Sequence, residues 1–114
     1  MREIKFRAYG PNCKMMWDWD GVKRIANVVG WEHFDAGERI LMQYTGLEDK
    51  NGVEIYEGDI CLVEGLGNCE VDICKFYGAV FKQDGFDYPV IDGIAEGDSF
   101  EVIGNIYESP ELLE

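Results

Sequence analysis

Residues 39–63 read RILMQYTGLEDKNGVEIYEGDICLV, and they carry the clearest strand and turn signals in the chain. Two short apolar runs, at residues 39–44 and 60–63, enclose a segment at residues 53–56 that alternates polar and apolar side chains. Asn51-Gly52 and Glu57-Gly58-Asp59 separate these runs with residues typical of tight turns. Short apolar runs with such turns between them predict neighbouring β-strands.

The same pattern extends in both directions from this stretch. Further strands are predicted at residues 3–9, 14–20, 69–76, 79–81 and 100–107. Residues 22–34 fit neither the helical nor the strand period cleanly, and their β-branched side chains favour a strand. Residues 84–98 are predicted to form an acidic loop region, which begins at a hairpin turn over residues 83–85. Short strands at this spacing predict an all-β protein with a small barrel or a strongly bent sheet.

Length, composition and charge restrict the class of protein. The chain has 114 residues, of which 46% are apolar, so we expect one domain with its own core. No apolar run is long enough to span a membrane and no signal-peptide pattern begins the chain, so we expect a cytoplasmic protein. The net charge is −13, with −2 in residues 1–57 and −11 in residues 58–114. An acidic surface repels phosphates, so we expect no direct nucleic-acid binding, except through Arg2, Lys5 and Arg7.

The four cysteines are expected to be reduced thiols that pack as small apolar side chains. Their positions, Cys13, Cys61, Cys69 and Cys74, do not follow the spacing of a zinc site, and no calcium-loop pattern is present. Residues 65–68 lack the lysine of a phosphate-binding loop and predict a turn. We therefore predict no metal and no cofactor.

Two surfaces and one catalytic alternative are candidates for function. Trp17, Trp19 and Trp31 are either ordinary core residues or anchors of a partner or self-association surface, because tryptophan is favoured in both places. A second candidate is a carboxylate surface that imitates the phosphates of DNA, formed by Asp84, Asp87, Asp92, Glu96, Asp98 and Glu101. The third is an enzyme that uses His33, the only histidine, or a cysteine thiol.

Three segments carry a family resemblance: residues 2–8 (REIKFRA), residues 44–60 (YTGLEDKNGVEIYEGDI) and residues 101–113 (EVIGNIYESPELL). Together they resemble the YopX-like proteins of bacterial phages and prophages. Tyr9 stands where this family commonly has tryptophan, and residues 13–38 match no family signature. The resemblance implies a small all-β fold with an SH3-like barrel, and it implies no activity and no catalytic residues.

Together these observations predict a single domain in three parts. Residues 1–43 form N-terminal strands and an irregular segment, residues 44–107 form the SH3-like barrel, and residues 108–114 form a short C-terminal helical turn that begins at Ser109-Pro110. The predicted function is a non-enzymatic protein-binding module in the bacterial cytoplasm. Its partner is unknown, and exposed strand edges would also allow homo-oligomers.

Overall fold

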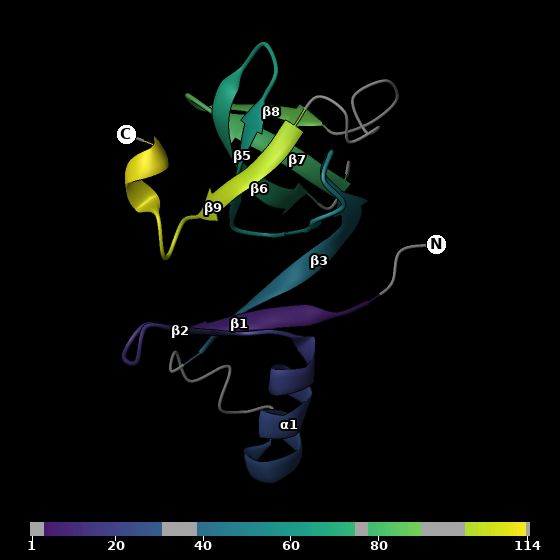
Figure 1. Ribbon diagram of the computed structural model, residues 1–114, viewed down its shortest axis with the longest axis vertical. Helices are drawn as coiled ribbons and strands as arrows, with labels where there is room; N and C mark the ends of the chain where they lie inside the picture. The colour runs from purple at the N-terminus through teal and green to yellow at the C-terminus, as the bar shows by residue number, and fades with distance from the viewer. Residues whose placement is uncertain (1–3, 31–38, 75–77, 90–99, 114) are drawn as a thin grey trace.

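The computed structural model describes residues 4–30, 39–74, 78–89 and 100–113. These residues form two antiparallel sheets and one α-helix, with the helix and the five-stranded sheet at opposite ends of the longest axis (Figure 1). The first sheet contains β1 (Phe6–Gly10), β2 (Met15–Trp17), β3 (Ile40–Glu48) and β4 (Glu54–Tyr56) in the order β2-β1-β3-β4. The second contains β5 (Asp59–Val63), β6 (Gly67–Cys74), β7 (Gly78–Gln83), β8 (Phe86–Pro89) and β9 (Phe100–Asn105) in the order β8-β7-β6-β5-β9. The predicted all-β class is confirmed.

The second sheet curls around its own apolar core to form a half-barrel. The buried side chains of this core come from β4 to β7 and from β9, and they include Ile55, Val71, Phe81 and Phe100. The rings of Phe81 and Phe100 meet edge to face with their centroids 5.2 Å apart. The apolar side chains that alternate along the predicted strands therefore pack together in this core.

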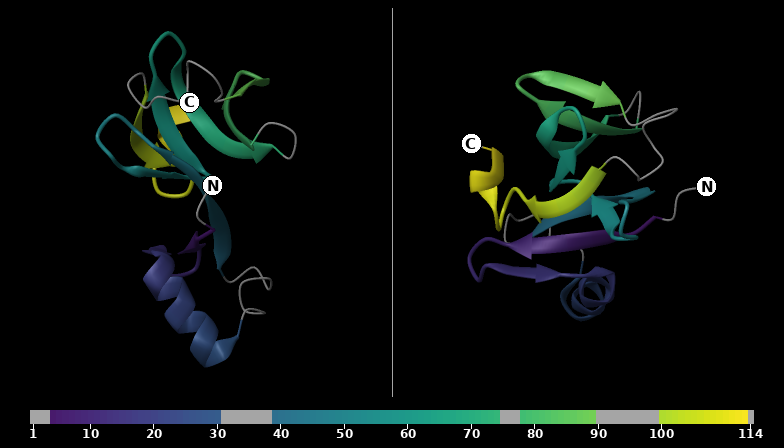
Figure 2. Two further views of the ribbon diagram at one scale, coloured as in Figure 1. Left: turned by 90° about the vertical axis from the view of Figure 1, so that its right-hand side faces the viewer. Right: turned by 45° about the horizontal axis from the view of Figure 1, so that its top comes forward.

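Strand β3 belongs to both halves of the molecule. Its first residues pair with β1, where Ala8 lies opposite Leu41, and its later residues pair with β4, where Tyr44 lies opposite Tyr56. Figure 2 shows β3 running from the α1 end to the barrel. The predicted boundary between residues 43 and 44 lies inside this strand.

The expectation of a strand over residues 22–34 is wrong for its described part, because residues 19–29 form helix α1 (Trp19–Val29). The Asp18 side chain caps this helix by accepting a hydrogen bond of 2.9 Å from the Gly21 N–H. Val22 is fully buried against Ala8 on the sheet. The apolar face is difficult to recognise in the sequence because Val28, another apolar residue of the same helix, is 79% exposed and does not belong to that face. The same helix limits the second predicted strand to β2.

The prediction of a loop over residues 84–98 is also wrong in part. Residues Phe86–Pro89 form β8, which pairs with β7 through a two-residue turn at Asp84-Gly85. Both turn residues have positive φ, 52° and 84°, which is the type I′ geometry that a tight hairpin needs. The predicted hairpin at residues 83–85 is present, whereas its second strand was missed.

The segments that resemble the YopX-like proteins form turns and caps. At Glu57-Gly58-Asp59, Gly58 has φ of 87° and the Asp59 carboxylate accepts a hydrogen bond of 2.8 Å from the Tyr56 N–H. At the end of β9, the Asn105 side-chain oxygen accepts hydrogen bonds from the N–H groups of residues 107 and 108. The predicted C-terminal turn is the 3₁₀ helix η1 (Pro110–Leu113).

The β3–β4 loop is tied to the free edge of β9 by a buried carboxylate. One oxygen of Asp49 accepts hydrogen bonds from the N–H groups of Asn51 and Val53, at 2.8 and 2.9 Å. The other oxygen accepts the Val102 N–H at 2.9 Å, and the Lys50 N–H donates to a β9 carbonyl at 3.2 Å. Asp49 thus supplies β9 with an acceptor that a further strand would otherwise provide.

Candidate functional site

A cleft opens between the start of α1 and strand β4. Its larger lobe has a volume of about 750 Å³ and is lined by residues from β1, β2, α1 and the β3–β4 region: Arg7, Met16, Trp17, Asp18, Asp20, Gly21, Arg24, Val53, Glu54 and Tyr56. A smaller lobe of about 250 Å³ adds Lys5 and Trp19. Asp18, Asp20, Glu54 and Tyr56 line both lobes, so the two lobes are neighbours. We refer to these residues together as the cleft.

Arg7 joins the cleft to the barrel. Its guanidinium Nη2 lies 2.6 Å from the Asp59 carboxylate, and the group sits over the Tyr56 ring at 5.0 Å from its centroid. Burial raises the pKa of Asp59, while the charge and hydrogen bond of Arg7 and the Tyr56 N–H act in the opposite direction. Arg7 Nε is buried and has no hydrogen-bond partner among the described residues. The charge of Arg7 is therefore already neutralised inside the protein.

Two of the three predicted tryptophans lie in the cleft. Trp17 ends β2 and Trp19 begins α1, and both are half-buried against the core cluster around Val22. The Arg39 guanidinium lies 5.2 Å from the Trp17 ring and the Lys23 ammonium lies 5.3 Å from the Trp19 ring. Each ring is thus part of the core and part of a cleft wall. Trp31 lies outside the described residues.

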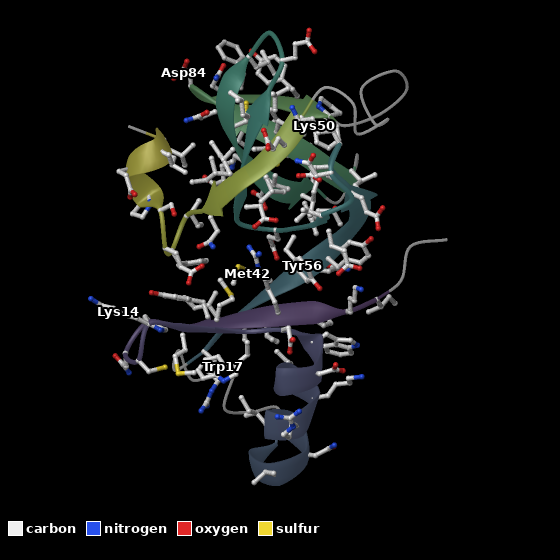
Figure 3. The ribbon with its side chains drawn as sticks, in the orientation of Figure 1. Lys14, Trp17, Met42, Lys50, Tyr56 and Asp84 are labelled. Atoms are coloured by element: carbon white, nitrogen blue, oxygen red, sulfur yellow. The ribbon has the colours of Figure 1, made fainter. Side chains whose placement is uncertain are left out.

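The mouth of the cleft carries exposed charges. Asp18 uses one carboxylate oxygen to cap α1, and Asp20 lies 3.5 Å from the Lys23 ammonium in a pair that is half exposed or more. Glu54 is paired with Lys5. Arg24 is exposed and has no ion pair with another described residue. Figure 3 shows Trp17 on the α1 side of β1 and Tyr56 on the barrel side.

Sequence patterns identified the tryptophans of this site as candidate binding residues, but not most of the residues that form its other walls. Lys5, Arg24, Glu54 and Tyr56 come from three separate segments, and only the tertiary fold brings them together. One local signal was available, because an aspartate at position 18 directly before the periodic apolar residues of α1 is a typical helix start.

The acidic residues that were predicted to imitate DNA do not all lie together. Asp84 and Asp87 line a groove of about 780 Å³ with Glu70, between the β7–β8 hairpin and η1. Glu101 lines a different groove, of about 410 Å³, and lies 3.7 Å from the Lys50 ammonium. These grooves involve opposite edge strands of the second sheet, β8 and β9. Asp92, Glu96 and Asp98 lie outside the described residues.

The thiols occupy two kinds of environment. Cys61 and Cys69 lie opposite each other on β5 and β6 and are fully buried, and burial raises the pKa of both. Cys13 is exposed in the β1–β2 turn, and Cys74 is half-buried. His33 lies outside the described residues. Across the described ranges, no group of three or more histidine, cysteine or acidic side chains is placed to hold a metal ion.

Among the described residues, no helix has the length and apolar character required to cross a membrane. No curated protein matches the chain. Over the full length of both chains, the protein is similar to the crystal structure of protein EF1440 from Enterococcus faecalis, with 26% identity and a TM-score of 0.67. The family model described as YopX protein matches residues 5–114. The chain therefore belongs to the YopX protein family, and the predicted resemblance is confirmed.

Proposed function

We propose that this chain is a non-enzymatic protein-binding module and that its partner docks in the cleft between α1 and β4. The observation that carries the proposal is the composition of the cleft, whose walls include half-buried Trp17 and Trp19, the Tyr56 side chain and exposed charged groups. Tryptophan, tyrosine and arginine are the residues that most often dominate binding energy at protein interfaces. We place this activity in the bacterial cytoplasm and assign it to a phage or prophage accessory protein, following the family resemblance.

The tryptophans suit this role because they are held in place before the partner arrives. Trp19 packs against the Phe6 ring with centroids 5.9 Å apart, and Trp17 packs on the Ala8 and Val22 cluster with the Arg39 guanidinium over its ring. Their side chains therefore lose little conformational freedom on binding, which favours affinity. Met16 and the 48% exposed Val53 add apolar surface to the larger lobe.

Capture of partners from a bacterial lysate tests the proposal. Val53→Lys places a long charged side chain in the larger lobe, and Val28→Lys places the same side chain on the exposed face of α1 that does not line the cleft. We expect the wild-type protein and Val28→Lys to capture the same partner, and Val53→Lys to lose it. If Val53→Lys retained the partner at the wild-type level, the cleft would not be the docking site.

A second candidate function is an acidic inhibitor that imitates nucleic acid, and one observation favours it. Asp84 and Asp87 share a groove with Glu70 and Lys82. The hydrogen bond of Lys82 to Asp72 raises the pKa of the lysine, and the charges of Asp72, Asp87 and Glu70 act in the same direction. A mimic should bind a basic DNA-binding protein in competition with duplex DNA, with an affinity that falls steeply as salt rises. The variant Asp84→Asn/Asp87→Asn should weaken that binding, whereas salt-tolerant binding that ignores these substitutions would exclude the mimic.

An enzyme that uses His33 or a thiol stays an untested alternative. Burial raises the pKa values of Cys61 and Cys69, which makes their thiolates scarce at neutral pH. A broad hydrolase screen, with a His33→Ala variant as the comparison, tests this alternative directly. Product formed by the wild-type protein and lost in a folded His33→Ala variant would support it.

A further inference from the structure

A lysine of the chain itself occupies the aromatic and acidic corner of the smaller lobe. The Lys23 ammonium lies 5.3 Å from the Trp19 ring centroid and 3.5 Å from the Asp20 carboxylate. A cation is thus held between an aromatic face and a carboxylate at the mouth of the smaller lobe. Both partners of the ion pair are solvent-accessible, with side-chain exposures of 50% for Lys23 and 80% for Asp20. Such an exposed pair contributes little to stability and is easily exchanged.

We propose that Lys23 marks the place where an arginine from a basic segment of a partner protein binds, an inference that rests on the proposed function. A guanidinium can stack on an indole ring and bind a carboxylate through two parallel hydrogen bonds, which an ammonium cannot do. The arriving arginine replaces Lys23 at Trp19 and pairs with Asp20. Lys23, being half exposed, then moves into solvent.

The charges of the cleft favour a basic occupant. Lys5 is paired with Glu54 and Arg7 with Asp59, so the charges of these two cations are compensated within the protein. Asp18 has one carboxylate oxygen that caps α1 and a second that accepts no hydrogen bond from a described residue. When Lys23 leaves Asp20, the exposed groups of the cleft mouth are the carboxylates of Asp18 and Asp20 and the guanidinium of Arg24. Two negative charges then stand against one positive charge, which favours a basic occupant.

The net charge of the whole molecule also favours a basic partner. With a net charge of −13, the protein attracts basic segments over the distance that salt leaves unscreened. This long-range attraction alone would not select the cleft, because most of the negative charge lies in residues 58–114. Selection comes from Trp17 and Trp19, which flank Asp18 in the sequence and line the two lobes.

The experiment uses a fluorescein-labelled triarginine peptide, with trilysine, triglutamate and a single-stranded oligonucleotide as comparison probes. Binding is followed by fluorescence anisotropy, and its location by the indole N–H signals of Trp17 and Trp19 in nitrogen-15 NMR spectra. We expect triarginine to bind more tightly than trilysine and to shift both indole signals. The other two probes should leave these signals unchanged.

Three variants give the sharpest test, because the proposal predicts tighter triarginine binding for one, weaker binding for the second and little change for the third. Lys23→Gln removes the internal competitor and should tighten triarginine binding about threefold, whereas Asp18→Asn/Asp20→Asn should weaken it about tenfold. Asparagine keeps the helix cap, so the second variant should stay folded. Lys14→Gln makes the same charge change as Lys23→Gln at the tip of the β1–β2 turn, away from the cleft, and should have little effect.

The inference is overturned if Lys23→Gln binds triarginine no more tightly than Lys14→Gln does. It is also overturned if triglutamate or the oligonucleotide shifts the indole signals in place of triarginine. In either case the proposed docking role of the cleft survives, provided that Val53→Lys still loses the partner captured from lysate. Retention of that partner by Val53→Lys would instead remove the proposed function itself.

Discussion

Replacement of Asp49 by asparagine should destabilise the protein far more than its place in a turn indicates. Asp49 is 5% exposed, and its two side-chain oxygens accept hydrogen bonds from three backbone N–H groups. An asparagine can keep the two hydrogen bonds to Asn51 and Val53 through its single oxygen. Its amide group then faces the Val102 N–H, donor against donor. The loss of one charge-assisted hydrogen bond, with the partly buried Val102 N–H left facing another donor, costs about 2–3 kcal/mol.

Chemical denaturation in urea measures this cost directly. For a domain of this size, about 2–3 kcal/mol corresponds to a fall in melting temperature on the order of 10 °C. Glu48→Gln is the matched control, because Glu48 is the neighbouring carboxylate and is exposed, so its effect should stay within about 0.5 kcal/mol. Amide hydrogen exchange at Val102 should also accelerate in Asp49→Asn and remain unchanged in the control.

The pH dependence gives an independent test of the same contacts. Burial acts to raise the pKa of Asp49, but the N–H groups of Val102, Val53 and Asn51, together with the charge of Lys50, bring it below its usual value. A carboxylate with a lowered pKa in the folded state stabilises the protein above about pH 4, and this contribution is lost as the pH falls through the folded-state pKa. The stability gap between wild type and Asp49→Asn should therefore close in acid. A gap below about 0.5 kcal/mol at neutral pH, or one that does not change with pH, would refute this account of Asp49.

Three further predictions follow from the backbone, the buried ion pair and the thiols. Lys14→Gly should stabilise the protein by up to about 1 kcal/mol in a thermal melt, because Lys14 has φ of 56°, a conformation that costs a side chain energy and glycine little. Arg7→Met should cost about 3–5 kcal/mol at neutral pH because it leaves the Asp59 carboxylate buried without its cation. Since burial already raises the pKa of Asp59, this deficit should shrink as the pH falls and the carboxyl group is protonated, which urea titrations at several pH values would measure. Cys61 and Cys69 should react with a thiol reagent only at the rate of unfolding, well after the exposed thiol of the β1–β2 turn.

Features that depend on neighbours in the sequence could be predicted. Glu57-Gly58-Asp59 and Asp84-Gly85 form turns because their side chains and φ angles suit a turn in almost any surroundings, and both were identified. Helix α1 was missed because the apolar Val28 lies outside its packed face, which blurs the helical period, and because its first turn contains Gly21. In the structure, a methyl group on Gly21 would lie 3.3 Å from the Trp17 side chain, so the glycine permits close packing and does not mark a turn.

Features that depend on distant residues could not be predicted. The acceptor for the Val102 N–H lies 53 residues earlier in the chain, at Asp49, and no local pattern indicates that partner. The cleft could not be predicted for the same reason, because its walls come from the start of the chain, from the start of α1 and from β4. The sequence therefore predicted the tryptophans as candidates for binding, but not the surface that contains them.

The path of β3 has a consequence for how the molecule unfolds. One continuous strand of nine residues carries ladder hydrogen bonds to β1 in its first half and to β4 in its second half. Disruption of either ladder loosens the strand on which the other is built. Both ends of the molecule should consequently melt in a single cooperative transition, and a fragment that begins at residue 44 would start with half of a severed strand and should not fold autonomously.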